Sequence, residues 1–541
     1  MKKVCKVLIG VTMMAALFSG CDKQSDEKNP DIHKDNYKYE QQLNIINDNN
    51  RNYYEIFVSS FYDSNGDGTG DIKGIIEKLD YITDLGFNGI WLMPIMPSPT
   101  YHKYDVTDYY SIDPSYGNLD DFKQLTAECE KRDVKVLIDL VFNHTSDKHP
   151  WFLEASAYLQ SLGKEEDPDP VKCPYVEYYH FSKEDKGGWH AVEGTDWYYE
   201  GVFWDQMPDL KLENKAVRKE IEEITDYWLG LGVGGFRLDA AKEYVSGSKD
   251  SNVEILSWYC DYVKSKDPDA YIVAEVWDSF LTIADYYESD IDSIFNYPLA
   301  QHDGSILKIV RNTGGSSQKS IAEIMEIMQQ AYGEKNSDYI DAPFISCHDN
   351  SRVSAQYAND EDAMKLAAGI LMTMNGSPFV YYGEEIGMNS QGDKDENKRL
   401  EMHWSDKDKK GTPNPPANAD KVKQTFSAVD EQIKEPLSLY QYYKRAIRIR
   451  NENPEIARGK VAVIDTLDQD HISGVKKEWN NSEILIIYNT GTEEAQVNME
   501  AAGIDGYGIR GYLTVDGSEV MLESSMLKMP SKSIVILKRI G

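Results

Sequence analysis

Positive charge is in short supply in this sequence. Its 541 residues hold 57 Lys and Arg against 91 Asp and Glu, which gives a formal net charge of −34 at pH 7. A surface of this sign repels phosphate backbones and offers no basic footprint, so we expect no nucleic-acid partner. Anionic substrates are disfavoured unless the binding site carries local positive charge.

Long hydrophobic runs are scarce as well. The mean hydropathy is −0.55, yet aromatic residues make up 11% of the chain. Low hydropathy excludes a polytopic membrane protein, and the aromatic content excludes a disordered chain. At roughly 100 to 200 residues per domain, the length predicts two to four domains.

Cysteine is rare, with six in the whole chain. The spacing is irregular and matches neither a zinc pattern nor a compact disulfide framework. We expect buried thiols at the four positions in the body of the chain, which are Cys129, Cys173, Cys260 and Cys347.

The N-terminus has the pattern of a secretory signal. Three lysines precede an apolar run at 7–18 that is too short to span a bilayer. The sequence LFSGC (17–21) resembles the bacterial lipobox, in which Cys21 would become the lipidated first residue after loss of residues 1–20. The alternative is an ordinary signal peptide with a chance cysteine.

The residues after Cys21 predict a tether. The segment from Asp22 to about Glu40 is charged and almost free of aliphatic residues, as expected of a solvated linker, and we place the tether at 21–48. We therefore expect an exported protein, lipid-anchored to the membrane or cell surface of a bacterium.

The middle of the chain predicts a barrel. Short apolar runs alternate with helical stretches such as 75–85, 119–132 and 216–229, which indicates a parallel sheet. About eight units are present, the number that closes a (β/α)8 TIM barrel over 49–144 and 207–458, and an open doubly wound sheet is the alternative. The predicted strands lie within 53–61, 87–95, 134–144, 232–240, 270–277, 293–297, 342–350 and 377–385.

Polar residues gather at the carboxyl ends of four of these strands. Such ends converge on one face of a barrel, where the active site is built. Arg237 and Asp239 are two residues apart and so share a face of their strand. The residues concerned are Asp139, Asn143, His144, Arg237, Asp239, Glu275, His348 and Asp349.

Two carboxylates in different environments suit the cleavage of a glycosidic bond. A positive charge keeps the nucleophile ionised, and burial keeps the proton donor protonated. Arg237 beside Asp239 suits the first role, and Glu275 beside Trp277 suits the second.

Four ordered motifs resemble those of glycoside hydrolase family 13, the α-amylase family. They are DLVFNH (139–144), GFRLDA (235–240), EVW (275–277) and SCHDN (346–350). The resemblance implies a retaining mechanism with Asp239 as nucleophile, Glu275 as general acid/base and Asp349 as the third carboxylate. It also implies that Arg237, His144, His348 and the stacking Tyr104 bind substrate at the −1 subsite.

The segment MPDLK (207–211) is similar to a further family region, where MPDLN marks an intermediary group that includes bacterial lipoprotein α-amylases; Lys211 departs from it. This resemblance and the expected export favour an endo-acting α-1,4-glucan hydrolase that degrades starch and maltodextrins. An exo-acting α-glucosidase, an oligo-1,6-glucosidase and a neopullulanase-like enzyme are alternatives. Two further ones are a non-catalytic glycan-binding lipoprotein and an unrelated metal-dependent barrel enzyme.

The sequence DSNGDGTGD (63–71) resembles the opening of a calcium loop, because its oxygen-bearing residues are spaced two apart and Gly68 allows a sharp turn. It departs from an EF-hand at Gly74, where a bidentate Glu would lie. We expect Ca2+ or Mg2+ as a structural ion and no organic cofactor. The predicted ligands are Asp63, Asn65, Asp67 and Asp71, with the carbonyl of Thr69 implied by the resemblance.

A second calcium site of the family would use Asn143, but Glu243 replaces the usual His. The insertion at 145–206 resembles the family's domain B, and its aromatic residues are either sugar-stacking or its own core. The Pro-containing stretch at 389–419 is predicted to be a long loop that shapes the cleft. Alternating runs across 459–541 predict a C-terminal antiparallel β-sandwich, and we expect a monomer.

Overall fold

The computed structural model describes residues 39–300, 303–315, 318–392, 394–467 and 470–540. Cys21, the predicted signal peptide and most of the predicted tether lie outside the described residues. Within the described ranges, no helix combines the length and the apolar character needed to cross a membrane.

A parallel sheet forms the centre of the molecule. Its strand order is β10-β1-β2-β3-β7-β8-β9, so neighbours in sequence are neighbours in space. The short strands are buried on both faces, as expected where helices cover the outside and side chains fill the inside. Their bounds are β1 (Tyr53–Ile56), β2 (Gly89–Leu92), β3 (Lys135–Leu140), β7 (Gly235–Leu238), β8 (Tyr271–Ala274), β9 (Ser293–Ile294) and β10 (Phe379–Tyr381).

An irregular segment at 341–345 closes the sheet. Phe295, just after β9, forms a parallel bridge with Ala342, and Phe379 of β10 donates its N–H to the Pro343 carbonyl at 2.9 Å. Proline has no N–H to donate, which explains why this segment forms only a partial ladder. The strands thus form the ring of a TIM barrel, and the open doubly wound alternative was wrong.

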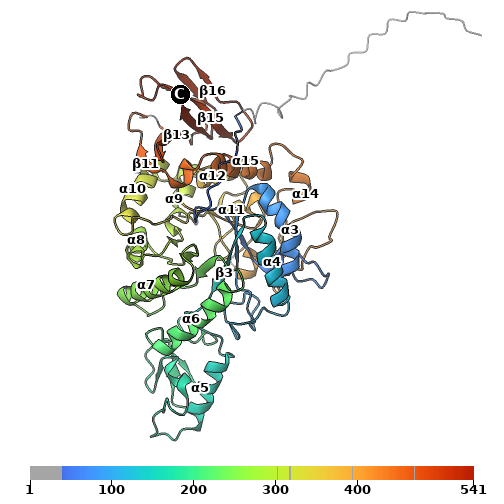
Figure 1. The fold of residues 1–541 in the computed structure, drawn as a ribbon. Helices are drawn as coiled ribbons and strands as arrows, with labels where there is room; N and C mark the ends of the chain where they lie inside the picture. The colour runs from blue at the N-terminus through green and yellow to red at the C-terminus, as the bar shows by residue number, and fades with distance from the viewer. Residues whose placement is uncertain (1–38, 301–302, 316–317, 393, 468–469, 541) are drawn as a thin grey trace, which may run out of the picture.

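Helices surround this ring (Figure 1). They comprise α2 (Val58–Phe61), α3 (Ile72–Leu85), α4 (Leu119–Glu130), α6 (Lys215–Leu229), α7 (Lys249–Lys266), α8 (Phe280–Tyr286), α9 (Ser305–Arg311), α10 (Ile321–Gly333), α11 (Val353–Gln356), α12 (Glu361–Thr373), α13 (Asp395–Lys398), α14 (Val429–Gln432), α15 (Leu439–Glu452) and α16 (Glu455–Arg458). Short 3-10 turns are η1 (Pro174–Glu177), η2 (Tyr287–Ser289), η3 (Tyr297–Leu299) and η5 (Glu384–Ile386).

Local sequence fixes where several helices begin and end. Asp71 accepts a hydrogen bond from the N–H of Gly74 and so caps α3, which ends at Gly86 in a left-handed conformation with φ of 101°. Asn118 and Asp121 form a capping box at the start of α4. These caps hold the ends of the helices that flank β2 and β3, and therefore the loops that build the mouth of the barrel.

Inside the barrel, aromatic rings fill the core. The Tyr53 ring stacks between Tyr271 and Phe379, with centroids at 5.2 and 4.7 Å. Trp91 lies above this layer, against His348 and Phe295. The interior is therefore a packed core and not a channel.

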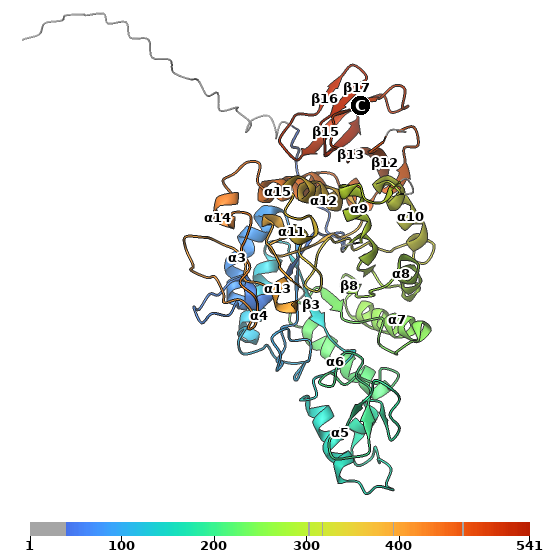
Figure 2. The same cartoon turned by 180° about the vertical axis from the view of Figure 1, so that it is seen from behind.

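The chain between β3 and α6 projects away from the barrel, opposite to the C-terminal sheets (Figures 1 and 2). It contains a three-stranded antiparallel sheet and one longer helix. Part of its aromatic content is core, because Tyr199 packs against Phe152 at 4.8 Å, whereas Trp204 is 37% exposed. Its elements are α5 (Pro150–Ser161), β4 (Phe181–Ser182), β5 (His190–Ala191) and β6 (Tyr198–Tyr199).

Two antiparallel sheets form the C-terminal domain, with strand orders β11-β12-β13-β18-β15 and β14-β17-β16. Apolar residues from both sheets, such as Leu485, Leu537 and Leu527, share one buried cluster, so the domain is a sandwich. The strands are β11 (Lys460–Val463), β12 (Ile472–Trp479), β13 (Ser482–Asn489), β14 (Ala495–Asn498), β15 (Tyr507–Thr514), β16 (Met521–Glu523), β17 (Met526–Met529) and β18 (Ser533–Arg539).

The first described residues, 39–48, lie in the predicted tether and contact the barrel. Asn44 donates its N–H to the Asn451 carbonyl at 2.8 Å, and Asp48 pairs with Arg458 at 2.6 Å. The domain boundaries stay predictions. The four cysteines of the body are buried and free, as the irregular spacing predicted.

Candidate active site

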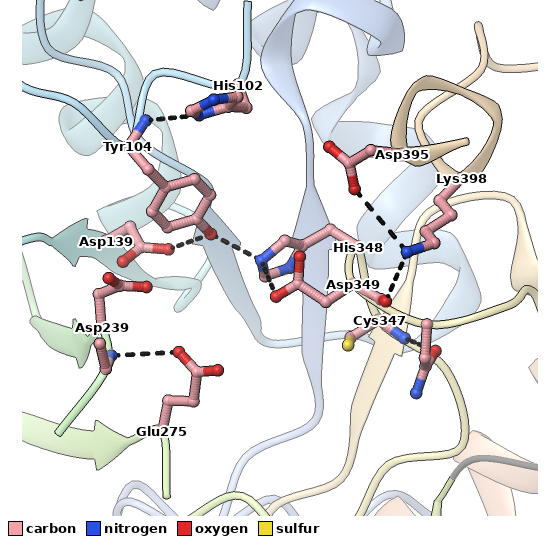
Figure 3. A network of polar contacts seen from close by, with 12 residues as sticks. His102, Tyr104, Asp139, Asp239, Glu275, Cys347, His348, Asp349, Asp395 and Lys398 are labelled. Carbon is pink, nitrogen blue, oxygen red and sulfur yellow. Dashed lines mark hydrogen bonds and ion pairs between the residues drawn. The ribbon is translucent and has the colours of Figure 1, made fainter. Parts of the chain in front are cut away.

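Five of the polar residues predicted at the strand ends lie together at the carboxyl end of the barrel: Asp139, Asp239, Glu275, His348 and Asp349 (Figure 3). Asp139 lies in β3, Arg237 in β7 with Asp239 just after it, and Glu275 follows β8. His348 and Asp349 follow the irregular closing segment. The barrel thus brings four distant segments of the chain to one cluster.

Arg237 is the hub of this cluster. Its guanidinium is 1% exposed and donates to three carboxylates: Nη1 lies 2.9 Å from Asp139 and 2.6 Å from Asp239, and Nη2 lies 2.7 Å from Glu275. Although burial alone disfavours the charge, the nearby acids, Asp139 foremost, hold the pKa of Arg237 well above its ordinary value. A permanent cation therefore touches both carboxyls that a two-carboxylate mechanism requires.

One cation cannot compensate three buried acids, so protons are retained here. Burial raises the pKa of Glu275 to about 7, against the lowering effect of Arg237. Burial also raises the pKa of Asp139, but Arg237 donates to both of its oxygens and Tyr104 adds a third hydrogen bond. The Oε1 atom of Glu275 has only a long contact with the Tyr297 hydroxyl, at 3.4 Å. Glu275 is therefore the carboxyl able to present a proton to a ligand.

The exposure of their side chains distinguishes the acid that supports the cluster from those that can contact a ligand. The Asp139 side chain is fully buried, whereas those of Asp239, Glu275 and Asp349 are 10, 14 and 30% exposed. Asp139 can only support the cluster from below, while the other three reach the open side of the site.

The two histidines differ in charge. Asp349 and Glu55 raise the pKa of His348 to about 10 although burial lowers it, so the ring is an imidazolium at neutral pH. Burial lowers the pKa of His144 to about 4, so that ring is neutral. Both nitrogens of His144 face protein groups, the Tyr104 carbonyl and the Asn143 amide, each at 3.2 Å.

Tyr104 connects these groups. Its hydroxyl donates to Asp139 Oδ2 at 3.0 Å and lies 2.7 Å from His348 Nε2, and its ring stacks on the His348 ring. The residue is 8% exposed. Tyr104 can therefore offer one edge of its ring to a ligand while its hydroxyl stays in the network.

The long loop after β10 also reaches the site, as the Pro-containing stretch predicted. Arg399 donates to Asp349 Oδ1 at 3.0 Å, and Lys398 donates to the Asp349 carbonyl at 2.8 Å. Burial alone would raise the pKa of Asp349, but His348 and Arg399 together hold it well below its ordinary value. Asp349 is thus an anion held on both oxygens by cations.

Exposed aromatic rings border the cluster. Trp277, next but one to Glu275, is 43% exposed and stacks on Tyr297 with centroids 4.8 Å apart. Phe203 is 50% exposed and contacts His144. Flat apolar faces beside buried carboxyls suit the faces of sugar rings.

The predicted metal loop is a compact turn after α2. Asp63 accepts hydrogen bonds on both oxygens from loop N–H groups, including that of Gly68 at 2.7 Å, and Asp71 accepts from Ser64 and Gly74. Within the described ranges, no group of three or more His, Cys, Asp and Glu side chains is arranged to hold a metal ion. The donor set of the loop adds an amide and a carbonyl to its carboxylates, an all-oxygen chemistry that fits Ca2+ or Mg2+.

At the junction with the inserted segment, Asn143 donates to Asp209 at 3.3 Å, and its Oδ1 is buried without a partner. Burial raises the pKa of Asp209 to about 7. The negative charge of Glu243 also raises the pKa of Asp209. Glu243 occupies the position at which the family's second calcium site has a His.

Sequence reasoning missed three residues of the cluster: Glu55, Lys398 and Arg399. Glu55 carries a signal that could have been used, because it is the one charged residue in the apolar run YYEIFV (53–58). Arg399 and Lys398 lie in an irregular polar loop, where no spacing marks them.

Comparisons with known proteins agree with this geometry. A family model described as "Alpha amylase, catalytic domain" matches residues 55–459. Alpha-amylase 3 of Dictyoglomus thermophilum is 38% identical over 82% of this chain and 86% of its own. Glucan 1,6-alpha-glucosidase of Streptococcus pneumoniae is 28% identical over 83% of this chain and 92% of its own. The solved structure of Eubacterium rectale Amy13B is 43% identical, covers 92% of this chain and 97% of its own, and superposes with a TM-score of 0.90.

Proposed function

The chain belongs to the α-amylase family of glycoside hydrolases and acts on α-glucosidic bonds, and from this premise we propose that it is a retaining, endo-acting α-1,4-glucan hydrolase outside the cytoplasm. The observation that carries the mechanism is the position of Arg237, which contacts Asp239 and Glu275 with the two ends of one guanidinium.

In the proposed mechanism Asp239 is the nucleophile and Glu275 is the general acid/base. Asp239 bonds to the anomeric carbon while the glycosidic C–O bond breaks and Glu275 gives its proton to the leaving oxygen. Water then attacks the glycosyl-enzyme, Glu275 takes a proton from that water, and Asp239 leaves. Two displacements retain the α configuration.

The remaining cluster would bind the sugar at the −1 subsite. Asp349 and the imidazolium of His348 can accept from and donate to neighbouring hydroxyls, and Tyr104 can stack on the ring. His144 would contribute as a neutral ring after exchanging the Tyr104 carbonyl for a ligand hydroxyl. Because these charged groups are held in place before the substrate binds, little free energy is spent on reorienting them during the reaction.

The endo-acting mode is supported by the α-amylase relative and by an open, aromatic-bordered site, whereas the 28% identical relatives named as glucosidases support the exo-acting alternative. The product profile on amylose, pullulan and maltotriose tests it. Loss of iodine staining before glucose accumulates indicates endo-attack. Glucose from the first minutes would indicate an α-glucosidase, and absence of any product would revive the glycan-binding alternative.

We propose that the loop at 63–71 binds Ca2+ or Mg2+ through Asp63, Asn65, Asp67, the Thr69 carbonyl and Asp71. An ion there would compensate two of the three carboxylate charges and tie the segment after α2 to the start of α3. Calcium added to chelator-treated protein should raise the Tm in wild type and not in Asp67→Ala, since binding only to the folded state stabilises it. Equal behaviour of the two proteins would refute this site.

Export stays a proposal that rests on the signal-peptide pattern, and the lipid anchor at Cys21 one that rests on the lipobox. Metabolic labelling with a radioactive fatty acid should mark the wild type in a bacterial host and leave Cys21→Ser unlabelled. Labelling of both proteins, or of neither, would contradict the anchor. The proposed monomer is checked by light scattering of the chain without residues 1–21.

A further inference from the structure

Glu55 lies beneath the site in the middle of the barrel. It belongs to β1, is 1% exposed, and shares the inward face of that strand with Tyr53. Its Oε1 atom lies 2.5 Å from His348 Nδ1 and also faces the His348 backbone N–H at 3.3 Å. A buried acid is costly unless it is paired, and His348 is the partner that the barrel provides.

The two nitrogens of His348 face acceptors on opposite sides. Nδ1 faces Glu55, and Nε2 lies 3.0 Å from Asp349 Oδ2 and 2.7 Å from the Tyr104 hydroxyl. The Tyr104 proton goes to Asp139, so its oxygen accepts. Two carboxylates at such distances require a proton between each of them and the ring, and the ring is then positively charged.

The direction of the whole hydrogen-bond chain follows from this. His348 donates toward Asp349 and Tyr104, Tyr104 donates to Asp139, and Arg237 donates to Asp139 as well as to the two catalytic carboxyls. If Nε2 lost its proton, the link to Asp349 would break and the Tyr104 hydroxyl could turn its proton toward Nε2, while the links from Arg237 would remain.

We propose that Glu55 is a positioning residue that keeps His348 doubly protonated and oriented, so that His348 holds Asp349 as an anion and can donate to substrate once a ligand hydroxyl replaces one acceptor of Nε2. This inference takes the identity of the substrate from the proposed function and in that respect rests on it. Glu55 itself does not reach the substrate, because it is buried and His348 lies between it and the partly exposed Asp349.

Other charges also lie near the His348 ring. Asp349 is its neighbour in sequence and contacts Nε2, and Asp139 of β3 interacts with the ring through its charge. Arg237 of β7 and Arg399 of the loop after β10 act on Asp349. The acids Asp349 and Asp139 favour the charge on the ring. Glu55 is the one acid of these that contacts Nδ1, so its removal should change the protonation of the ring most directly.

The test is Glu55→Gln, which keeps the shape and an acceptor oxygen while removing the charge. Imidazole nitrogen NMR on protein labelled at histidine, with His348 assigned by its own substitution, should show His348 doubly protonated at pH 8 in the wild type and neutral in E55Q. In the activity assay, the fall of kcat/KM at alkaline pH, which the Glu275 proton sets in the wild type, should begin about one pH unit lower in E55Q because the His348 proton is then lost as well. Activity near pH 5.5 should stay within about threefold of wild type.

The matched control is Glu385→Gln. Glu385 is also fully buried, but it accepts from the outward-facing Tyr54 and from Tyr81, away from His348. E385Q should leave the His348 resonances and the limb in place. Glu55→Asp keeps the charge and should retain the wild-type limb with a lower kcat.

A His348 ring that stays doubly protonated in E55Q, or an equal shift in E55D and E55Q, would overturn the proposal. The NMR readout does not need a substrate, so it decides the role of Glu55 even if the wild type fails to cleave α-1,4-glucans, which would refute only the proposed function.

Discussion

The two ends of the barrel bury positive charge in opposite ways. At the mouth, Arg237 contacts three carboxylates. At the other end, before β10, Arg450 and Lys477 donate to the backbone carbonyls of Met372, Met374, Gly376, Thr373 and Ile456.

Because of this difference, the mouth of the barrel serves reactivity and the opposite end serves stability. Carboxylates around Arg237 can take and give protons, and their pKa values respond to one another. The carbonyls around Arg450 and Lys477 cannot titrate, and several belong to the C-terminal end of α12, where helix carbonyls lack partners. Lys477 therefore fixes the C-terminal sandwich to the barrel, since it is in β12 and Thr373 ends α12, whereas Arg450 of α15 holds the end of α12 within the barrel.

The largest expected effect is at the mouth. Glu275→Gln should lower kcat about 10² to 10⁴-fold, because the amide cannot donate or accept the proton, while the Tm stays close to wild type. The control is Asp341→Asn at the other end, where burial also raises the pKa of the acid to about 7. D341N should keep kcat unchanged, and a comparable loss of activity in D341N would erase the contrast between the two ends.

The pH profile is the second test. Glu275 must be protonated to act as an acid, and burial raises its pKa to about 7. The kcat/KM value should therefore fall about tenfold per pH unit above pH 7, and this limb should be absent from the residual activity of E275Q. A limb that persists in E275Q would have to be assigned to another group of the cluster.

Sequence reasoning located the barrel and the main carboxyls because short motifs carry them. The motif GFRLDA places an arginine and an acid on one face of a strand. The order of the motifs along the chain indicates a parallel sheet. Glu55 and His348 are 293 positions apart, and only closure of the barrel brings them together. The apolar run in APFISCHDN (342–350) looks like a full strand in sequence, but Pro343 has no N–H to donate and the segment pairs only in part.

The burial of basic side chains at the opposite end could not be predicted either, because it also depends on contacts between distant segments of the chain. In ISGVKKEW (472–479) Lys476 and Lys477 are adjacent and so face opposite sides of the sheet, and nothing in the local sequence indicates that Lys477 is fully buried. Its position depends on α12 and α16 of another domain packing over β12, which no local pattern contains.

The third prediction concerns this lysine. Lys477→Met should leave two carbonyls without donors and lower stability by about 1–3 kcal/mol, with kcat unchanged. Burial holds the pKa of Lys477 well below its ordinary value, so the unfolded chain binds more protons between the two values. The contribution of Lys477 to stability therefore grows as pH rises toward 10.5, and the Tm difference between K477M and wild type should widen from pH 7 to pH 10. A constant difference would mean that the lysine does not titrate on unfolding.

The smallest effect is expected beside the catalytic residues themselves. Cys347 precedes His348, is 6% exposed, and burial raises the pKa of its thiol well above the ordinary value, so the side chain packs as a neutral group. Cys347→Ala removes one sulfur atom from this packing and should lower stability by about 1 kcal/mol, seen as a small drop in Tm, with kcat within about twofold of wild type. A thiol reagent should leave the folded enzyme active for the same reason. Strong inactivation by the reagent, or a large loss of kcat in C347A, would show that an uncharged neighbour matters at the mouth as much as the charged network does.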